Sequence, residues 1–356
     1  MIHAELTGGF FNDLCIDWET LQRDTGRMHQ SPIPVQQAGM VLDDLWLDNV
    51  RNKSIWVKLP SGRQGGLVEE DDGNLSWRAF DDAGEPVSPV EVIQTVGPFE
   101  KRFKRIRGER PHAKFIRFGA QPTPSGDGFF VSSPQNPLSI KRRKCLVFEG
   151  GVLGAVHNGF PYEKNGHFLL LQASVRGCDV DFPYAPQALT PGVVAAFFKL
   201  AEHLGDRWAL AYNDLHAGAT QNWLHAHALR GDPFPVERFH RVALGGGVSY
   251  ALGYPAGVLA FEGVGAAGLW PFFLKLQESK TPCNMLVRGQ TVFIYGRNRH
   301  FEMISEFPTG AMAVSELSGR LLLSDHQIYE SLDAVMIRQA IAKTTKTVEQ
   351  LLDLLF

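Results

Sequence analysis

The clearest hydrophobic pattern in the chain lies between residues 145 and 235. The segment "CLVFEGGVLGAVHNGFPYEKNGHFLLLQAS" predicts a strand, a turn, a strand, a loop and a strand. The continuous apolar run in "HFLLLQAS" is typical of a strand that is buried on both faces. Further along, "WALAYN" predicts a strand, "DLHAGATQN" a loop and "WLHAHAL" a second strand.

A helix is predicted over residues 191–204, because apolar side chains recur there at helical spacing. Thr190 is suited to the N-cap, Pro191 to the first helical position, and Gly205 to the position after the last turn. The recurring apolar residues are Val193, Phe197, Leu200 and Leu204.

After residue 235 a similar order of elements returns. "GVLAFEGV" predicts a strand, "GAAGLWPFFLKLQES" a helix that starts at about Pro271, and "CNMLVRGQTVFIYG" a hairpin with "RGQ" at its turn. The chain closes on "MIRQAIAKTTKTVEQLLDLLF", which predicts an amphipathic helix. The similar order suggests a duplication, although no close sequence repeat accompanies it.

Residues 1–110 have the weakest pattern. The stretch "SIWVKLPSGRQGGLVEEDDGNLSWRAFDD" predicts short strands joined by polar turns, one of them at "DDGN". The basic stretch "KRFKRIRGERPHAK" (101–114) has two interpretations. It is either an anion-binding patch or a solvated connector whose charge offsets nearby acidic segments, and we favour the connector.

Composition excludes several classes of protein. The 356 residues are 44% hydrophobic and 21% charged, with a formal net charge of -3, so nothing points to nucleic acid or to anionic membranes. No apolar run approaches the length needed to span a bilayer, and we expect no signal peptide. The four cysteines are scattered, without a CxxC pair, which favours the cytoplasm over a disulfide framework or a structural zinc site. They are Cys15, Cys145, Cys178 and Cys283.

Candidate chemistry is concentrated in "NWLHAHAL". In a strand, Trp223, His225 and His227 share one face, with the two imidazoles about 7 Å apart along the strand. Such a pair suits a metal site, or a histidine nucleophile with a neighbour that binds the substrate. A structural pair of buried histidines is the third interpretation.

The metal interpretation is the weaker of the first two, because a third ligand is missing nearby; only His203, His216 and His240 are offered. The small residues of "HAGAT" would instead let a phosphate approach the backbone. The segment therefore favours phosphorus chemistry over zinc, and no cofactor is expected.

Four segments resemble the histidine-triad and galactose-1-phosphate uridylyltransferase superfamily, in particular its GDP-hexose phosphorylases and, more distantly, its diadenosine tetraphosphate phosphorylases. The likeness extends over about residues 145–325. The segments are "HNGFPYEKNGHFLLLQ" (157–172), "LAYNDLHAGATQNWLHAHAL" (210–229), "LGYPAGVLAFEG" (252–263) and "CNMLVRGQTVFIY" with "SELSGRLLL" (283–295 and 315–323).

The resemblance implies a histidine-triad-like α+β fold, with a mixed, mostly antiparallel sheet flanked by helices. We expect a segment of unclear role over residues 1–110, packed on the core. A first histidine-triad-like half with the catalytic strand would cover 111–235, and a second half with the C-terminal helix would cover 236–356.

The resemblance also implies a reaction in which His225 attacks the α-phosphorus and forms a covalent nucleotidyl-histidine. His227 stands where transferases and phosphorylases carry Gln and histidine-triad hydrolases carry His, and it would contact the phosphate oxygens. Asn158 would bind the ribose, and His167 would support the site. The phosphate cradle would consist of Asn213, Gly218, Thr220, Gln221 and Asn222. Trp223 is a further candidate contact. Glu262, in a segment that resembles the family, could contact the base or sugar, or hold a loop. Apart from the resemblance, Arg297 follows a predicted strand and could bind a phosphate or sugar, with surface solvation as the favoured alternative.

Trp223 departs from the pattern, because the family carries His at this position. An indole N–H donates a hydrogen bond but does not exchange a proton near neutral pH. Either the leaving group needs no acid, or His216 supplies one, or the chain binds a nucleotide without turnover. Trp223 would then be a stacking surface or a plug, and plain core packing is a further alternative.

The expected partners follow from this interpretation. The substrate would be a nucleoside diphosphate sugar or a dinucleoside polyphosphate, and the acceptor inorganic phosphate or a sugar phosphate. A histidine-triad nucleotide hydrolase and a silent nucleotide-binding protein are the alternatives. We expect a cytoplasmic protein without nucleic-acid or membrane partners, for which a homodimer is a candidate assembly.

Overall fold

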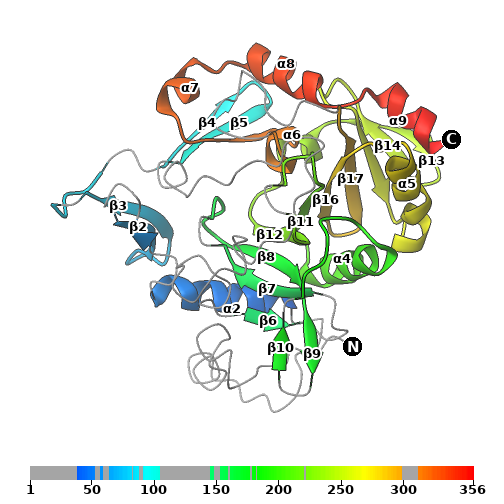
Figure 1. Cartoon of the computed structure of the whole chain (residues 1–356). Coiled ribbons are helices and arrows are strands. Elements are labelled where there is room, and N and C mark those ends of the chain that lie inside the picture. Colours follow the sequence, from blue (N-terminus) through cyan, green and yellow to red (C-terminus); the bar gives the residue numbers. More distant parts are fainter. Residues whose placement is uncertain are drawn as a thin grey trace.

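A ten-stranded antiparallel sheet forms the centre of the protein (Figure 1). The computed structural model describes residues 38–52, 57–58, 64–81, 83–87, 91–104, 145–147, 153–158, 161–176, 179–181, 183–219, 222–298 and 312–356.

The sheet divides into two halves of five strands each. The first half contains β6 (Cys145–Val147), β7 (Leu153–His157), β8 (His167–Gln172), β11 (Trp208–Asn213) and β12 (His225–Arg230). The second half contains β13 (Arg241–Gly245), β14 (Val248–Ala251), β15 (Val258–Glu262), β16 (Cys283–Arg288) and β17 (Thr291–Gly296).

Both halves have the same topology. From edge to centre the order is β6-β7-β8-β12-β11 in the first half and β13-β14-β15-β17-β16 in the second, and β11 pairs with β16 at the centre. In each half a helix precedes the last two strands: α4 (Pro191–Leu204) in the first and α5 (Ala266–Glu278) in the second. The similar order of elements in the sequence therefore corresponds to a repeated strand order. The predicted boundaries at residues 111 and 236 stay predictions.

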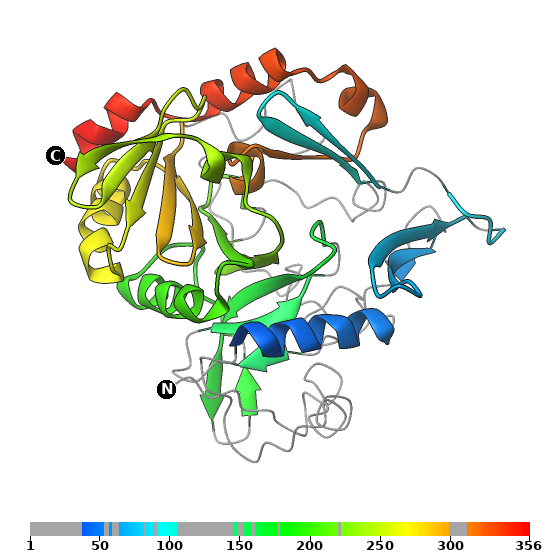
Figure 2. The ribbon, with the colours of Figure 1, turned by 180° about the vertical axis from the view of Figure 1, so that it is seen from behind.

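The two faces of the sheet have different covers. One face packs against α4, α5, α2 (Ala38–Arg51) and α9 (Val348–Leu355), as Figures 1 and 2 show. The other face packs against α6 (Val314–Leu317), α7 (His326–Ser331), α8 (Ala334–Thr344) and a small sheet. That sheet contains β4 (Glu91–Val96), β5 (Phe99–Lys104) and β18 (Arg320–Leu323), with β5 and β18 parallel.

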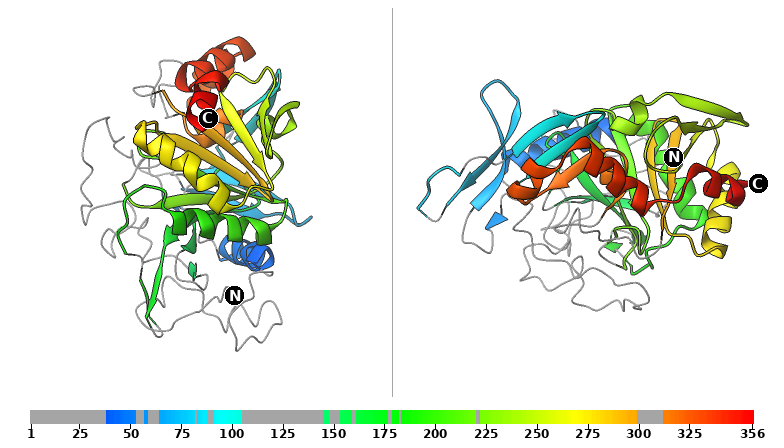
Figure 3. Two further views of the ribbon diagram at one scale, coloured as in Figure 1. Left: turned by 90° about the vertical axis from the view of Figure 1, so that its right-hand side faces the viewer. Right: turned by 90° about the horizontal axis from the view of Figure 1, so that it is seen from above.

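Smaller elements complete the described chain. A three-stranded sheet projects away from the main sheet (Figure 3), and a two-stranded sheet lies at the bottom of the view in Figure 1. The remaining elements are β1 (Val57–Lys58), β2 (Gln64–Glu69), β3 (Leu75–Phe80), β9 (Ser174–Arg176), β10 (Asp179–Asp181) and the 3-10 helix η3 (Pro235–Arg238). No helix in the described parts of the chain is long and apolar enough to span a membrane.

The predicted α+β class is confirmed, and so is helix α4. The Thr190 side chain accepts a hydrogen bond from the N–H of Val193, and Pro191 is the first helical residue. The C-terminal end at Gly205 has a φ of 69°, which glycine adopts without strain. Phe197 and the other apolar positions face the sheet.

Two helix predictions are wrong. Helix α5 begins at Ala266, so that Pro271 lies inside it. Burial of Leu269 and of later apolar residues such as Phe273 against the sheet outweighs the lost backbone hydrogen bond. The C-terminal helix is two helices, α8 and α9, because Thr347 caps a new helix through its hydroxyl and through Gln350.

The basic stretch is also not a solvated connector over residues 101–104. Lys101, Arg102 and Lys104 are only 3%, 7% and 3% exposed. Lys101 donates to the carbonyls of Tyr329 and Leu332 at 2.7 and 2.9 Å, at the end of α7. A basic run can lie inside a protein when each cation has acceptors, and the sequence does not reveal such distant acceptors. Residues 105–114 lie outside the described residues.

Candidate active site

Three histidines gather on one face of the sheet, on the neighbouring strands β8 and β12. His225 pairs with Leu171 and His227 with Leu169, while His167 lies two residues before Leu169 on β8, so all three share a face. The ring centres of His225 and His227 are 5.7 Å apart, and those of His227 and His167 are 5.2 Å apart. We refer to these three side chains as the imidazole row.

His225 is a buried imidazole with a fixed tautomer. Its Nδ1 lies 2.8 Å from the carbonyl oxygen of Trp223, which can only accept, so Nδ1 carries the proton and Nε2 carries the lone pair. The side chain is 4% exposed, and burial lowers the pKa of His225 to about 4. The ring is therefore neutral near pH 7, as a nitrogen nucleophile must be.

Gln187 positions the start of β12. Its Nε2 donates to the carbonyls of Asn213 and His225 at 2.6 and 2.9 Å, and its Oε1 accepts from the N–H of His225 at 2.8 Å. The Gln187 side chain thus joins the end of β11 to the start of β12, next to the last residue pair of these strands, Tyr212 and Ala226. The sequence gives no sign of this role, because Gln187 belongs to a proline-rich loop distant in the chain.

The predicted pair of Asn158 and His167 lies beside His227. His167 Nε2 is 3.0 Å from His227 Nδ1 and 3.0 Å from the side-chain amide of Asn158. The backbone N–H of Tyr162 donates to His167 Nδ1 at 3.2 Å. The structure therefore brings Asn158, His167, His227 and His225 together, although these residues come from two distant segments.

Trp223 packs at the entrance to β12. It is 9% exposed, and its ring meets that of Tyr184 edge-on with centres 5.6 Å apart. Its indole Nε1 has no hydrogen-bond partner among the described residues. Asn222 donates to the hydroxyl of Tyr184 at 3.1 Å and accepts from the N–H of Gln187 at 3.0 Å. Trp223 is thus largely a packed side chain, and Asn222 holds the neighbouring loop.

A second polar group holds the loop after β11. Asn213 Oδ1 accepts from Asn284 at 2.7 Å and from the N–H of Val314 at 2.9 Å. Asn284 also donates to the carbonyl of Ala217 at 2.6 Å and accepts from Arg297 at 3.1 Å. Arg297 is 1% exposed, and these contacts join β11, β16 and the start of α6. Substrate binding by Asn213 and Arg297 stays a prediction.

The small residues of the loop serve close packing. A Cβ on Gly218 would lie 2.8 Å from the Cβ of Ala313, and the φ of Gly218 is +97°. The backbone N–H groups of Leu215 and Ala217 already donate to Asp214, at 2.8 and 2.9 Å. Burial raises the pKa of the Asp214 carboxyl to about 7. Phosphate binding by Gly218 stays a prediction, and the predicted cradle residues Thr220 and Gln221 lie outside the described residues.

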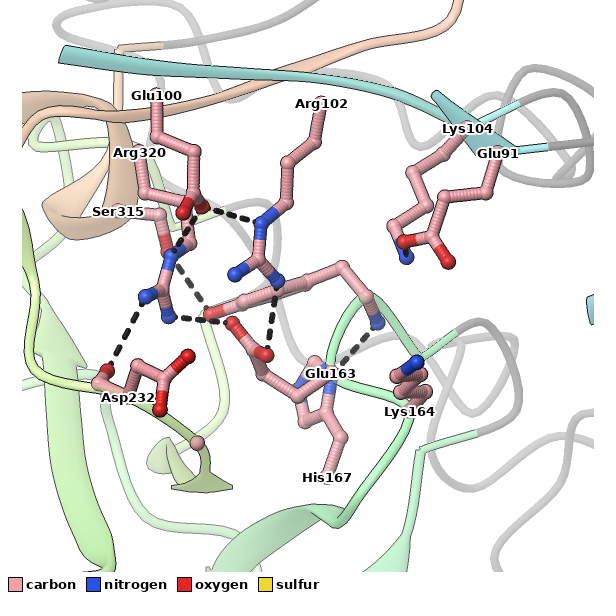
Figure 4. A network of polar contacts seen from close by, with 12 residues as sticks. Glu91, Glu100, Arg102, Lys104, Glu163, Lys164, His167, Asp232, Ser315 and Arg320 are labelled. Atoms are coloured by element: carbon pink, nitrogen blue, oxygen red, sulfur yellow. Dashed lines mark hydrogen bonds and ion pairs between the residues drawn. The ribbon is translucent and has the colours of Figure 1, made fainter. Parts of the chain in front are cut away.

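Glu163 is the centre of a buried ion network (Figure 4). Arg102 of β5 lies 2.9 Å from one carboxylate oxygen, and Arg320 of β18 lies 2.7 Å from the other. Glu100 contacts both guanidiniums from the opposite side. Burial alone would raise the pKa of Glu163, but the two cations outweigh it and hold the pKa below its usual value. We refer to these four side chains as the Glu163 ion network.

Glu262 is not brought to the imidazole row. It ends β15 beside Thr291, and β17 and β16 separate β15 from β11. It forms an ion pair with Arg241 at 2.7 Å, and its side chain is 51% exposed. Within the described residues, no group of three or more His, Cys, Asp or Glu side chains could hold a metal ion.

Sequence reasoning missed the residues that support the imidazole row. One signal was available: Asn284 is a polar residue inside the otherwise apolar run "CNMLV", and buried polar groups need partners. Glu163 and Ser315 had no such signal, because their partners come from other segments of the chain.

Fold and site together define a class: an α+β protein with a repeated antiparallel sheet and a neutral, buried histidine suited to nucleophilic attack. No protein-family model and no curated protein matches the sequence. Among solved structures, the chain is structurally similar to the yeast Ap4A phosphorylase Apa2.

The complex of Apa2 with Ap4A matches with a TM-score of 0.49 and 13% identity over 72% of this chain and 88% of that one. Apa2 without a ligand matches with a TM-score of 0.47 and 11% sequence identity, over 86% of this chain and 94% of that one. The complex of Apa2 with AMP matches with a TM-score of 0.49 and 12% sequence identity, over 87% of this chain and 95% of that one.

Proposed function

We propose that the protein is a nucleotidyltransferase of the phosphorylase type, which cleaves a nucleoside diphosphate sugar or a dinucleoside polyphosphate through His225. The observation that carries the proposal is the state of His225. Its Nδ1 is committed to the Trp223 carbonyl, which leaves the lone pair on Nε2, and burial keeps the ring neutral. The substrate class is the one implied by the sequence resemblance.

In the proposed first step, Nε2 of His225 attacks the α-phosphorus. A nitrogen–phosphorus bond forms as the bond from phosphorus to the leaving oxygen breaks, and the leaving phosphate keeps that electron pair. The positive charge on the ring is stabilised by the Trp223 carbonyl at Nδ1. In the second step an oxygen of inorganic phosphate attacks, the nitrogen–phosphorus bond breaks, and His225 returns to the neutral state.

Trp223 is compatible with this reaction because the leaving group is itself a phosphate. Such a group is stable as an anion, so it needs little protonation in the transition state. A packed indole without a transferable proton is then sufficient at this position.

The test is to trap the intermediate. The protein is mixed with Ap4A or a GDP-sugar in the absence of phosphate, quenched in base, where phosphorus–nitrogen bonds on histidine survive, and analysed by mass spectrometry of its peptides. We expect a nucleoside monophosphate on His225, which disappears when phosphate is added before the quench. Phosphate-dependent turnover without any adduct on His225 would contradict the mechanism.

A silent nucleotide-binding protein is the second candidate, and the packed Trp223 favours it. Calorimetry with GDP, AMP and Ap4A, combined with turnover assays on the same preparation, separates the two. Binding without turnover supports the silent protein. Turnover that yields the same products with and without phosphate supports a hydrolase, for which His227 is the relevant residue.

A further inference from the structure

The two histidines of β12 are both hydrogen-bonded through Nδ1, but to partners of opposite kind. His225 Nδ1 faces a carbonyl oxygen at 2.8 Å, which requires a proton on that nitrogen. His227 Nδ1 faces the imidazole of His167, whose Nε2 lies 3.0 Å away. The protonation of His167 therefore decides which nitrogen of His227 carries the proton.

His167 has only one neutral tautomer that fits its surroundings. The backbone N–H of Tyr162 donates to its Nδ1, so Nδ1 must hold a lone pair and Nε2 must hold the proton. A cationic ring is excluded by the same contact. Asn158 must then turn its amide oxygen, rather than its amide nitrogen, toward Nε2, since the two are interchangeable in position.

With a proton on His167 Nε2, His227 Nδ1 can only accept. We infer that His167 is a positioning residue that holds His227 neutral with its proton on Nε2, so that His225 and His227 stand side by side in opposite tautomers. Combined with the proposed function, on which this reading of the site depends, His225 offers a lone pair to phosphorus and His227 offers an N–H to a phosphoryl oxygen.

The opposite tautomers matter because the two rings share one environment. If His227 had its proton on Nδ1, its Nε2 lone pair would face the negative phosphoryl oxygens and repel them. The tautomer of His227 thus decides whether this side chain is a hydrogen-bond donor to the phosphate or a second nucleophile that competes with His225. His227 then resembles a side-chain amide in function, because it donates without changing charge.

The backbone N–H of Tyr162, which donates to His167, belongs to a segment fixed by further contacts. The Ser315 hydroxyl bonds that of Tyr162 at 2.9 Å, and Glu163, the next residue, is fixed by Arg102 and Arg320 (Figure 4). His167 is fully buried. The tautomer is therefore imposed by a rigid loop and not by exchange with solvent.

The first experiment reads the tautomers directly in the whole protein. With ¹⁵N-labelled histidine, two-bond nitrogen–proton correlation spectra at pH 7 show which ring nitrogen carries each proton. We expect Nδ1–H for His225 and Nε2–H for His167 and His227, with resonances assigned by single His→Gln variants. A proton on Nδ1 of His227, or on both of its nitrogens, would overturn the inference. No turnover is needed, so the result is independent of the proposed function.

The second experiment removes the positioning residue. His167→Gln keeps an amide donor, His167→Leu removes it, and His240→Gln changes an exposed histidine as a control. In His167→Leu we expect His227 to exchange between its two neutral tautomers, while the Gln variant keeps the wild-type spectrum.

The same variants separate a positioning role from a structural one. We expect kcat to fall roughly tenfold in His167→Leu and to recover in His167→Gln, because complete loss of one such donor costs about 100- to 1000-fold and His227 still adopts the donating tautomer part of the time. Equal losses in both variants, with the wild-type tautomer of His227 retained in His167→Leu, would show that His167 only fills space. If no variant and no wild type turns over, the proposed function fails while the NMR result still decides the inference.

Discussion

The two halves of the central sheet share a strand order but not a surface chemistry. In the first half the last strand, β12, begins His-Ala-His, and in the second half the last strand, β17, begins Thr-Val-Phe. Phe293 is therefore the counterpart of His227, and it is buried in the core under Arg241, whose guanidinium lies 5.8 Å from the ring centre. The backbone alone does not make a site.

The connections before these strands differ as much as the strands. Residues 214–224 lead into β12 and leave room for Trp223, whereas only Gly289 and Gln290 lead into β17. Gly289 has a φ of +54°, which suits a tight hairpin turn. The repeated strand order thus carries the candidate site in its first half only.

The largest expected effect is on the nucleophile. His225→Gln should lower phosphate-dependent release of nucleotide from Ap4A or a GDP-sugar by at least about 1000-fold, because no other group replaces an attacking nitrogen. Thr291→Gln, at the matching position of β17, should leave the rate unchanged. Steady-state kinetics of both variants measures the contrast, and an unchanged rate in His225→Gln would end the covalent mechanism.

The next effect is on stability. Glu163→Gln leaves Arg102 and Arg320 buried without their shared carboxylate, and we expect a loss of about 4 kcal/mol in the free energy of unfolding. The half-exposed ion pair of Glu262 with Arg241 should matter far less, so Glu262→Gln should cost less than about 1 kcal/mol. Urea unfolding measures both, and similar losses would show that burial of the network contributes little.

The pH dependence of stability gives a third contrast. The pKa of His225 is 6.5 when exposed and about 4 when folded, so below pH 6.5 the unfolded chain binds a proton that the folded chain refuses. Stability should therefore fall as pH falls from 6.5 to 4, by about 3 kcal/mol in wild type relative to His225→Gln.

Asp214 should change the pH dependence of stability in the opposite direction to His225, and single variants can separate the two contributions. Its pKa is raised to about 7, so the folded chain binds its proton first and gains stability as pH falls below 7. Asp214→Asn should remove that gain. Unfolding curves between pH 4 and 8 for both single variants distinguish the two groups, and a flat difference for His225→Gln would show that its ring is not held neutral by burial.

The smallest effect is expected at Trp223. Trp223→Phe removes the indole N–H and keeps the aromatic packing on Tyr184, so the rate should change less than about tenfold if no acid is required. Gly289→Ala, at the matching position of the second half, should change stability but not the rate. A loss in Trp223→Phe that grows with the pKa of the leaving group would show that the indole N–H assists its departure.

The sequence predicted the elements whose signals are local. Helix α4 has its cap, its proline and its glycine within one segment, and the alternation in "HAHAL" placed His225 and His227 on one face. The predictions of a helix starting at Pro271 and of a single C-terminal helix were wrong. In the first case tertiary packing outweighs Pro271, and in the second a Thr-Gln cap separates α8 from α9.

The support of the site was beyond local reasoning. Gln187, Glu163 and Ser315 act on residues tens to hundreds of positions away, and a single sequence does not show which segments meet. The basic strand β5 shows the same limit. From the sequence its lysines and arginine are expected at the surface, because some of the carboxylates and carbonyls that surround them come from distant parts of the chain.

The Glu163 ion network gives the site an order of assembly during synthesis. Strand β12 and its histidines leave the ribosome well before residue 320, so the loop of Glu163 must wait for Arg320 before its second cation arrives. Until then a carboxylate beside the histidines lacks half of its charge partners. The nascent chain thus holds the imidazole row beside an incomplete ion network until translation has passed β18.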